Sequence, residues 1–251
     1  MPEIDLFLLA MLFGVALFAG CLDTLAGGGG LIVLPALILT GLPPLEALGT
    51  NKMQGTMGTA TATWMMLKHR RVRWATMKPL MLWAFVGSGL GSIAVQFIDA
   101  SLLRYLIPVV LVGIAGYFLF SGKVLDVLHP VRVSLERFRR FIIPGIGAYD
   151  GMVGPGTGSF FSVALVAWQG KPLLEATAMA KCLNFATNFA SLLVFLTAGK
   201  LIWQIGLVMM AGQAMGAWLG SHLLFRIDPQ VLRVLIVIAC LAMLVRYFVT
   251  G

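Results

Sequence analysis

Residues 23–35 read DTLAGGGGLIVLP, and residues 150–162 read DGMVGPGTGSFFS. In both segments a glycine cluster begins four residues after an aspartate and interrupts an otherwise apolar run. Four consecutive glycines cannot continue a stable helix, because each costs about 1 kcal/mol relative to alanine. The sequence therefore predicts two apolar segments, each with a break in its helix.

The two breaks belong to a longer internal repeat. The segments that follow them, GLPPLEALGTNKMQGTMGT (41–59) and GKPLLEATAMAKCLNFATN (170–188), align with a constant spacing of 129 positions. The same spacing separates the members of six pairs: Glu46 and Glu175, Lys52 and Lys181, Trp74 and Trp203, Gly91 and Gly220, Asp99 and Asp228, and Arg104 and Arg233. The repeat predicts two homologous halves, 1–121 and 141–251, joined by a basic cytoplasmic linker at 122–140.

The composition is typical of a membrane protein. Hydrophobic residues make up 59% of the chain and charged residues 11%, with a mean hydropathy of +0.95, whereas soluble domains carry about 25% charged residues. Apolar stretches close to the roughly 20 residues that cross a bilayer occur at 47–67, 76–97, 102–121, 175–197, 203–224 and 231–249. We expect an all-α polytopic membrane protein in which each half contains a Gly-rich broken helix or re-entrant hairpin.

Basic residues predict the orientation of the first half. The loop KHRRVR (68–73) and the stretch 123–140 flank two expected spans, so both loops are expected on the cytoplasmic side. These loops also account for much of the net charge of +8, so no nucleic-acid partner is expected. Region 5–41 is long for one helical crossing. Its length favours hairpins and inverted halves over single crossings and parallel halves.

Four ionisable residues lie far from the expected loops: Asp23, Lys52, Asp150 and Lys181. A charge inside a membrane costs at least about 2.5–3.5 kcal/mol and indicates a functional site. One interpretation is a pair of structural salt bridges that tie each break to the next helix. The other is that the lysines attract an anion while an aspartate takes up or releases a proton.

Backbone N–H groups exposed at a broken helix suit an anionic ligand. The candidate substrate-binding residues are therefore Asp23, Gly27, Gly28, Gly29, Gly30, Asn51, Lys52, Gln54, Asp150, Gly154, Gly156, Thr157, Gly158, Lys181, Asn184 and Asn188. Two G-x-x-x-G motifs, at 87–91 and 216–220, predict close helix packing. No common catalytic or metal-binding motif occurs, so we expect no enzyme activity, cofactor or metal.

Four motifs carry a family resemblance: DTLAGGGGLIVLPAL (23–37), LGTNKMQ (48–54), YDGMVGPGTGSF (149–160) and AMAKCLNFATN (178–188). With them the chain resembles the TauE/SafE family, and in particular its subgroup of probable membrane transporter proteins. The resemblance covers nearly the whole chain and implies a multi-pass plasma-membrane protein of two homologous halves. Relatives are associated with export of sulfite, sulfoacetate and similar anions. The second break departs from the plain glycine pattern through Pro155 and Thr157.

We therefore expect a secondary transporter, an exporter of a small anion such as sulfite, a sulfonate or a related organic anion. Proton coupling is expected through Asp23 or Asp150. A passive anion channel and a non-transporting membrane partner of another protein remain alternatives. The expected partners are the small anion and the lipid bilayer, and a homo-oligomer is one assembly that the sequence allows.

Overall fold

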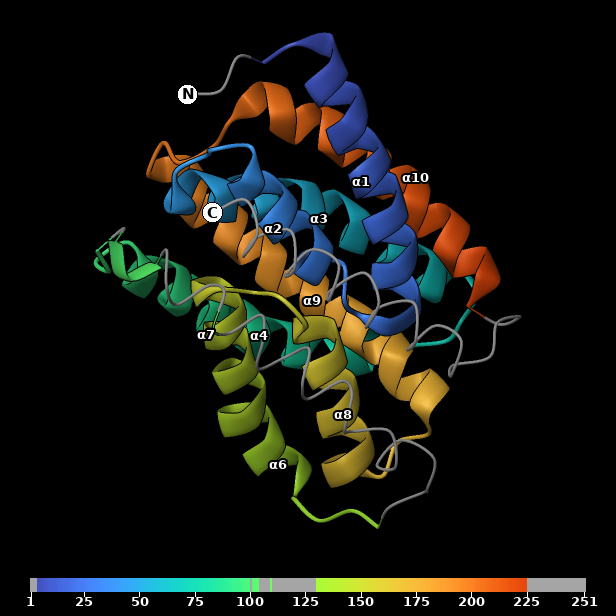
Figure 1. The fold of residues 1–251 in the computed structure, drawn as a ribbon. Helices are drawn as coiled ribbons and strands as arrows, with labels where there is room; N and C mark the ends of the chain where they lie inside the picture. The colour runs from blue at the N-terminus through green and yellow to red at the C-terminus, as the bar shows by residue number, and fades with distance from the viewer. Residues whose placement is uncertain (1–3, 100, 104–108, 110–129, 225–251) are drawn as a thin grey trace.

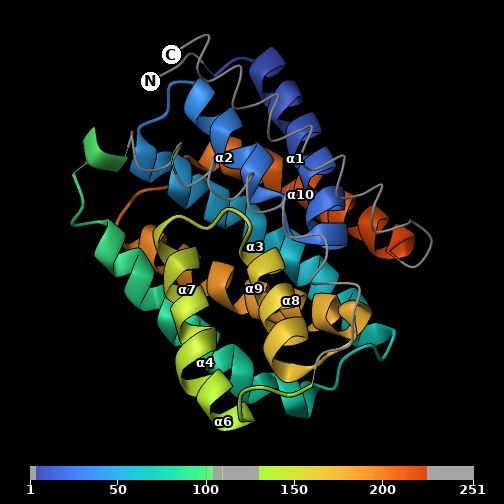
Figure 2. The same cartoon turned by 60° about the horizontal axis from the view of Figure 1, so that its bottom comes forward.

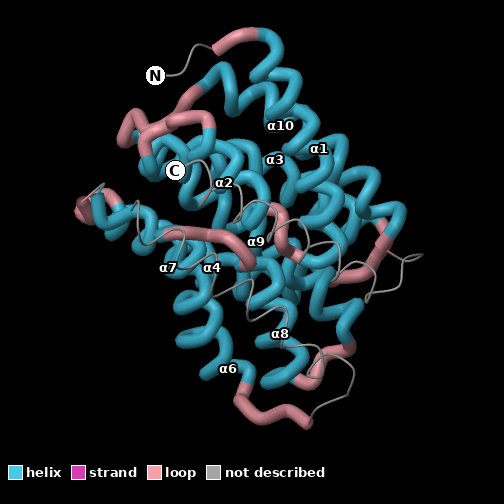
Figure 3. Tube along the Cα trace, viewed as in Figure 1, coloured by secondary structure: helices cyan, strands magenta, loops and turns pink. Residues whose placement is uncertain are grey.

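The computed structural model describes residues 4–99, 101–103, 109 and 130–224. Over this part of the chain the secondary structure is helical, without strands (Figure 3). The expected span 231–249, most of the span 102–121 and part of the linker 122–140 lie outside the described residues, as do Arg104, Asp228 and Arg233.

The helices are interrupted at the two places where the glycine clusters predict a break, between α1 and α2 and between α7 and α8. In chain order they are α1 (Leu6–Ala26), α2 (Gly30–Leu39), α3 (Pro44–Lys68), α4 (Trp74–Val95), α6 (Leu135–Arg137), the π-helical turn η2 (Phe138–Ile142), α7 (Ile143–Met152), α8 (Thr157–Gln169), α9 (Leu173–Thr197) and α10 (Trp203–Leu223). Proline precedes both α3 and α9, and the first turn of each contains a glutamate, Glu46 or Glu175. An acidic residue there interacts favourably with the helix dipole.

Within the part of the chain that the structure describes, three helices have both the length and the apolar composition to cross a membrane: Leu6–Leu25, Trp74–Val95 and Leu173–Thr197. Helices α3 and α10 contain 25 and 21 residues, which is also enough to span the hydrocarbon core. Large apolar side chains such as Leu90 of α4 and Trp218 of α10 are exposed, as they would be in contact with lipid. An all-helical fold with apolar helices, as expected for a membrane protein, is confirmed.

Helices α3 and α9 lie at the centre and run antiparallel (Figure 2). Near one end of the pair, Thr63 Oγ1 of α3 donates to the Lys181 carbonyl of α9 at 3.2 Å. Near the other end, the N–H of Ile202, which follows α9, donates to Thr50 Oγ1 at 3.1 Å. Helix α10 packs on α3 and α1 packs on α10, while α4 packs on α9 and α7 packs on α4.

Glycines allow the outer helices to approach closely. A Cβ atom at Gly87 would collide with the Pro144 carbonyl of α7, and one at Gly91 with the Ala148 carbonyl. On the other side, a Cβ atom at Gly216 of α10 would collide with a carbonyl of α1. The G-x-x-x-G motifs therefore lie at backbone contacts between helices, as predicted.

The chain reverses direction at each break, so that α2 and α8 run back in the opposite sense to α1 and α7 (Figure 1). Gly27 ends α1 with φ = 81°, and Gly156 precedes α8 with φ = 79°, a conformation that favours glycine. A Cβ atom at Gly158 would lie 2.9 Å from the Gly27 Cα. The two breaks are therefore in direct contact.

Candidate functional site

Each buried lysine pairs with an aspartate of the other predicted half. Lys52 Nζ of α3 lies 2.8 Å from Asp150 Oδ1 of α7. Lys181 Nζ of α9 lies 3.7 Å from Asp23 Oδ2 of α1 and also donates to the Asp23 main-chain carbonyl. The structural interpretation of the sequence paired each aspartate with the lysine on the next helix, which is wrong. The partners are exchanged because the two breaks are in contact with each other, so that each aspartate reaches the lysine of the other half.

The carboxylates of Asp23 in α1 and Asp150 in α7 lie at the N-terminal ends of the returning helices α2 and α8. Asp23 Oδ1 accepts a hydrogen bond from the Gly29 N–H at 3.1 Å, one residue before α2 begins. Asp150 Oδ1 accepts a hydrogen bond of 2.8 Å from Oγ1 of Thr157, which is the first residue of α8. A negative charge is stabilised at a helix N-terminus. The chain thus supplies its own anion at the places where the sequence predicted an external one.

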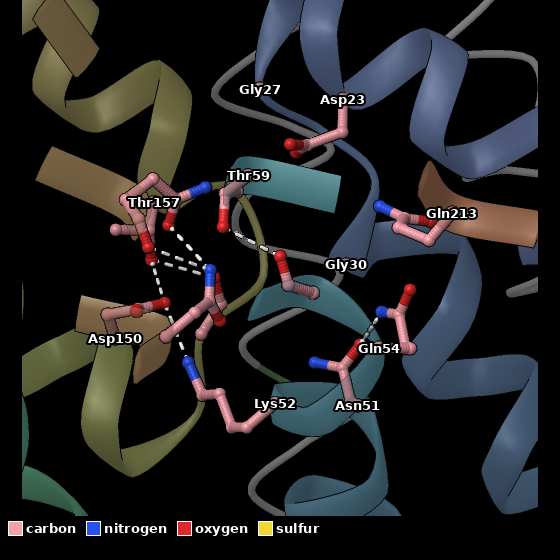
Figure 4. A pocket seen from close by; sticks show the side chains of 15 residues that line it. Asp23, Gly27, Gly30, Asn51, Lys52, Gln54, Thr59, Asp150, Thr157 and Gln213 are labelled. Carbon is pink, nitrogen blue, oxygen red and sulfur yellow. Dashed lines mark hydrogen bonds and ion pairs between the residues drawn. The ribbon is translucent and has the colours of Figure 1, made fainter. Parts of the chain in front are cut away.

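A cavity of about 30 Å³ lies between the breaks and the central helices (Figure 4). This volume accommodates about two water molecules. The predicted site residues that line it are Asp23, Gly27, Gly30, Asn51, Lys52, Gln54, Asp150, Gly154, Gly156, Thr157, Asn184 and Asn188. The other predicted site residues lie near it without lining it: Gly28, Gly29, Gly158 and Lys181.

The lining also contains Gly55, Thr59 and Gln213, which the sequence interpretation did not select. Thr59 lies seven residues after Lys52 and so shares its helix face, which was a usable signal. Gln213 of α10 extends across Gly58, where a Cβ atom would collide with it. Its counterpart in the 129-residue spacing is Ala84, so the repeat could not identify it.

Comparison with known proteins places the chain in a family. A profile described as "Sulfite exporter TauE/SafE" matches residues 12–247. The chain belongs to the TauE/SafE family. It is 41% identical over 236 residues to a "Probable membrane transporter protein" of Haemophilus influenzae. The aligned region covers 94% of this chain and 92% of that protein.

Two further relatives of this TauE/SafE chain have similar names. "Probable membrane transporter protein YfcA" of Escherichia coli K12 is 39% identical over 236 residues, 94% of this chain and 88% of that protein. "Probable membrane transporter protein ORF9" of a Sinorhizobium species is 38% identical over 246 residues, 98% of this chain and 94% of that protein. No solved structure matches. The family and the apolar helices together identify a membrane transporter.

In this TauE/SafE protein, three buried oxygen atoms of the cavity lining have no hydrogen-bond partner: Gln54 Oε1, Asp150 Oδ2 and Gln213 Oε1. Most buried polar atoms in folded proteins are paired, so unpaired atoms around a cavity indicate where water or a ligand binds. A side-chain amide can turn either its oxygen or its NH₂ group toward a ligand. The lining can therefore bind a ligand that both accepts and donates hydrogen bonds.

Proposed function

We propose that the protein is a secondary transporter that exports a small oxyanion, such as sulfite, a sulfonate or a related organic anion, across the plasma membrane. The observation that carries the proposal is the Lys52 ammonium group, which lines a buried polar cavity where the two breaks meet. A positive charge in a medium of low dielectric constant attracts an anion strongly. Asn51, Asn184 and Thr59 supply neutral polar groups beside it. The family description supports an oxyanion as the solute.

The proposed architecture has two inverted halves, 1–121 and 141–251, in a multi-pass protein. Helices α3 and α9 each contain 25 residues, begin and end 129 positions apart, and run antiparallel. Two left-handed positions recur at the same spacing, in Gly41 and Gly170 (φ 85° and 64°) and in Arg70 and Gly199 (φ 53° and 67°). Inverted repeats that place a site at their interface are common in secondary transporters.

Inverted halves predict that equivalent positions face opposite sides of the membrane. Lys68 and Thr197 are exposed, end α3 and α9, and lie 129 positions apart. In a variant without native cysteines, a single cysteine at position 68 is expected to react with an impermeant thiol reagent only from the cytoplasmic side, and one at position 197 only from the outside. Labelling of both positions from one side would contradict the inverted arrangement.

The size of the cavity favours a carrier over a passive channel. A sulfur oxyanion is larger than the two water molecules for which there is space, and the charged side chains of the lining are buried. Helices must therefore move to admit the anion, as they do when a carrier alternates between its two open states.

The proposal is tested with purified protein and four anions: sulfite, thiosulfate, methanesulfonate and acetate. A ligand that binds only the folded state raises its stability, by about 2.7 kcal/mol at a concentration one hundred times its Kd. We expect at least one of the sulfur oxyanions to raise the melting temperature above that in potassium chloride of equal ionic strength. Stabilisation by none of the four anions would contradict an anion site.

In the same assay, Gly30→Ala distinguishes an effect on anion binding in the cavity from an effect on the stability of the fold. A Cβ atom at Gly30 would lie 3.3 Å from the Pro155 Cα and 3.9 Å from Asn51 Nδ2, so the methyl group narrows the cavity with a small adjustment of the backbone. We expect anion affinity to fall about tenfold, which corresponds to about 1.4 kcal/mol, with near-normal stability. Gly14→Ala on α1, which has no described heavy atom within 4 Å, is the matched control. Unchanged anion binding by Gly30→Ala would exclude this cavity as the site.

A further inference from the structure

The two aspartates that line the cavity differ in how their carboxylate oxygens are bonded. Both oxygens of Asp23 have a partner: Oδ1 accepts the Gly29 N–H at 3.1 Å and Oδ2 lies 3.7 Å from Lys181 Nζ. The Asp23 main chain is held as well, since its carbonyl accepts from the Gly27 N–H at 2.7 Å and from Lys181. Asp23 is therefore bonded as a structural cap of α2.

One carboxylate oxygen of Asp150 accepts hydrogen bonds, and the other has no hydrogen-bond partner. Its Oδ1 accepts from both Lys52 Nζ and Thr157 Oγ1, each at 2.8 Å. Its Oδ2 is buried, has no hydrogen-bond partner and belongs to a residue of the cavity lining. An unpaired buried acceptor is costly. A proton bound at Oδ2 would remove the negative charge and provide a donor toward the cavity.

The charges of the site restrict what can enter. Asp23 and Asp150, when ionised, balance Lys52 and Lys181, so the four buried side chains carry no net charge. A monovalent anion alone would leave one uncompensated negative charge in a medium of low dielectric constant, which is strongly unfavourable. One proton taken up with the anion keeps the site neutral.

Asp150 and an entering anion also compete for the same cation. Lys52 lines the cavity and its ammonium group is held by Asp150 Oδ1 (Figure 4). Protonation weakens the attraction of a carboxyl group for a neighbouring ammonium group. A neutral Asp150 therefore releases Lys52 to an oxyanion, while the bonds that hold Asp23 in place stay intact.

We propose that Asp150 takes up one proton from water when an oxyanion replaces it as the partner of Lys52, and returns the proton to water when the anion leaves. This role rests on the proposed anion site and assigns proton coupling to Asp150, with Asp23 as a structural residue. The proton binds Oδ2, which turns the carboxylate into a carboxylic acid, and no other covalent bond changes. A monovalent anion and one proton then cross together without net charge movement.

The ionisable groups around Asp150 are consistent with this assignment. Helix α7 packs against α4, η2, α8 and α9. The Tyr149 hydroxyl is already bonded to the Pro155 carbonyl at 2.6 Å. Lys52 is the ion-pair partner of Asp150, Asp23 lines the same cavity, and Lys181 pairs with Asp23. The described ionisable residues of α4, η2 and the rest of α9 do not line the cavity: Lys78, Arg139, Arg140, Glu175 and Cys182.

Proton uptake is measured by titrating the purified protein with methanesulfonate, which stays monovalent near neutral pH. Calorimetry in buffers of different ionisation enthalpy gives the number of protons bound per anion. We expect about one proton for the wild type, so that affinity rises about tenfold for each unit by which the pH falls. We expect none for Asp150→Asn, renewed uptake for Asp150→Glu, and unchanged uptake for Glu46→Gln, which lies outside the cavity. Anion binding without proton uptake by the wild type, or loss of uptake in Asp23→Asn but not in Asp150→Asn, would overturn the assignment.

A second measurement follows the carboxyl group itself. Infrared difference spectra recorded as methanesulfonate is added at constant pH are expected to show the carbonyl band of a protonated carboxyl group, which Asp150→Asn loses. Binding of none of the four anions would contradict the proposed function. Bound methanesulfonate with a carbonyl band that persists in Asp150→Asn would support the function and overturn the role of Asp150.

Discussion

Lys52→Ala is expected to lower the free energy of unfolding by about 3–5 kcal/mol, because it leaves the Asp150 carboxylate buried without its counter-ion. Both side chains of the pair are at most 2% exposed. Removal of one member of a buried pair costs far more than removal of both. The double variant Lys52→Met with Asp150→Leu is therefore expected to recover most of the stability, as measured by thermal melting in detergent.

A partly exposed ion pair provides the control for this comparison. Lys200 Nζ lies 3.1 Å from Glu46 Oε1, with side chains 39% and 18% exposed. Lys200→Ala is expected to cost at most about 1 kcal/mol, because solvent screens this pair. Equal decreases in the free energy of unfolding for Lys52→Ala and Lys200→Ala would show that the buried pair contributes no more to stability than the partly exposed pair.

Gly91→Ala and Gly89→Ala should change stability in opposite directions, although they lie two residues apart on α4. A methyl group at Gly91 would collide with the Ala148 carbonyl of α7, whereas one at Gly89 would meet no described heavy atom within 4 Å. We expect Gly91→Ala to destabilise the protein by about 1–3 kcal/mol through overpacking. Gly89→Ala is expected to stabilise it by up to about 1 kcal/mol through helix propensity. Equal melting temperatures of the two variants would contradict the close contact between α4 and α7.

Local patterns in the sequence were enough to predict much of the fold. The boundaries of α3, α4, α9 and α10 differ by no more than three residues from those predicted. Uninterrupted apolar runs and glycine clusters act on the chain locally, so their effects can be read from neighbouring residues. The burial of Asp23, Lys52, Asp150 and Lys181 is confirmed for the same reason.

Partners that are distant in the chain could not be predicted in this way. A repeat shows that Lys52 and Lys181 are equivalent, but it does not show which break lies against which of them. The Gly29 N–H appeared open to an anion from the sequence, yet the Asp23 carboxylate six residues earlier accepts it. Gln213 lies among apolar residues in the middle of α10, and its place in the lining depends on how α10 packs against α3.

The exchanged ion pairs also affect how the protein is made. Asp23 is synthesised 158 residues before Lys181, which donates to its carbonyl. Lys52 lacks its native partner until the ribosome has added Asp150, and Asp23 lacks its own until Lys181 has been added. Insertion of the early helices therefore leaves charged side chains without partners in the bilayer or in the translocation channel. The contacts between the central helices can form only after α9 has been synthesised. The last stage of assembly is set by the order of synthesis, and a chain truncated before residue 150 lacks the counter-ions for both of its buried charges.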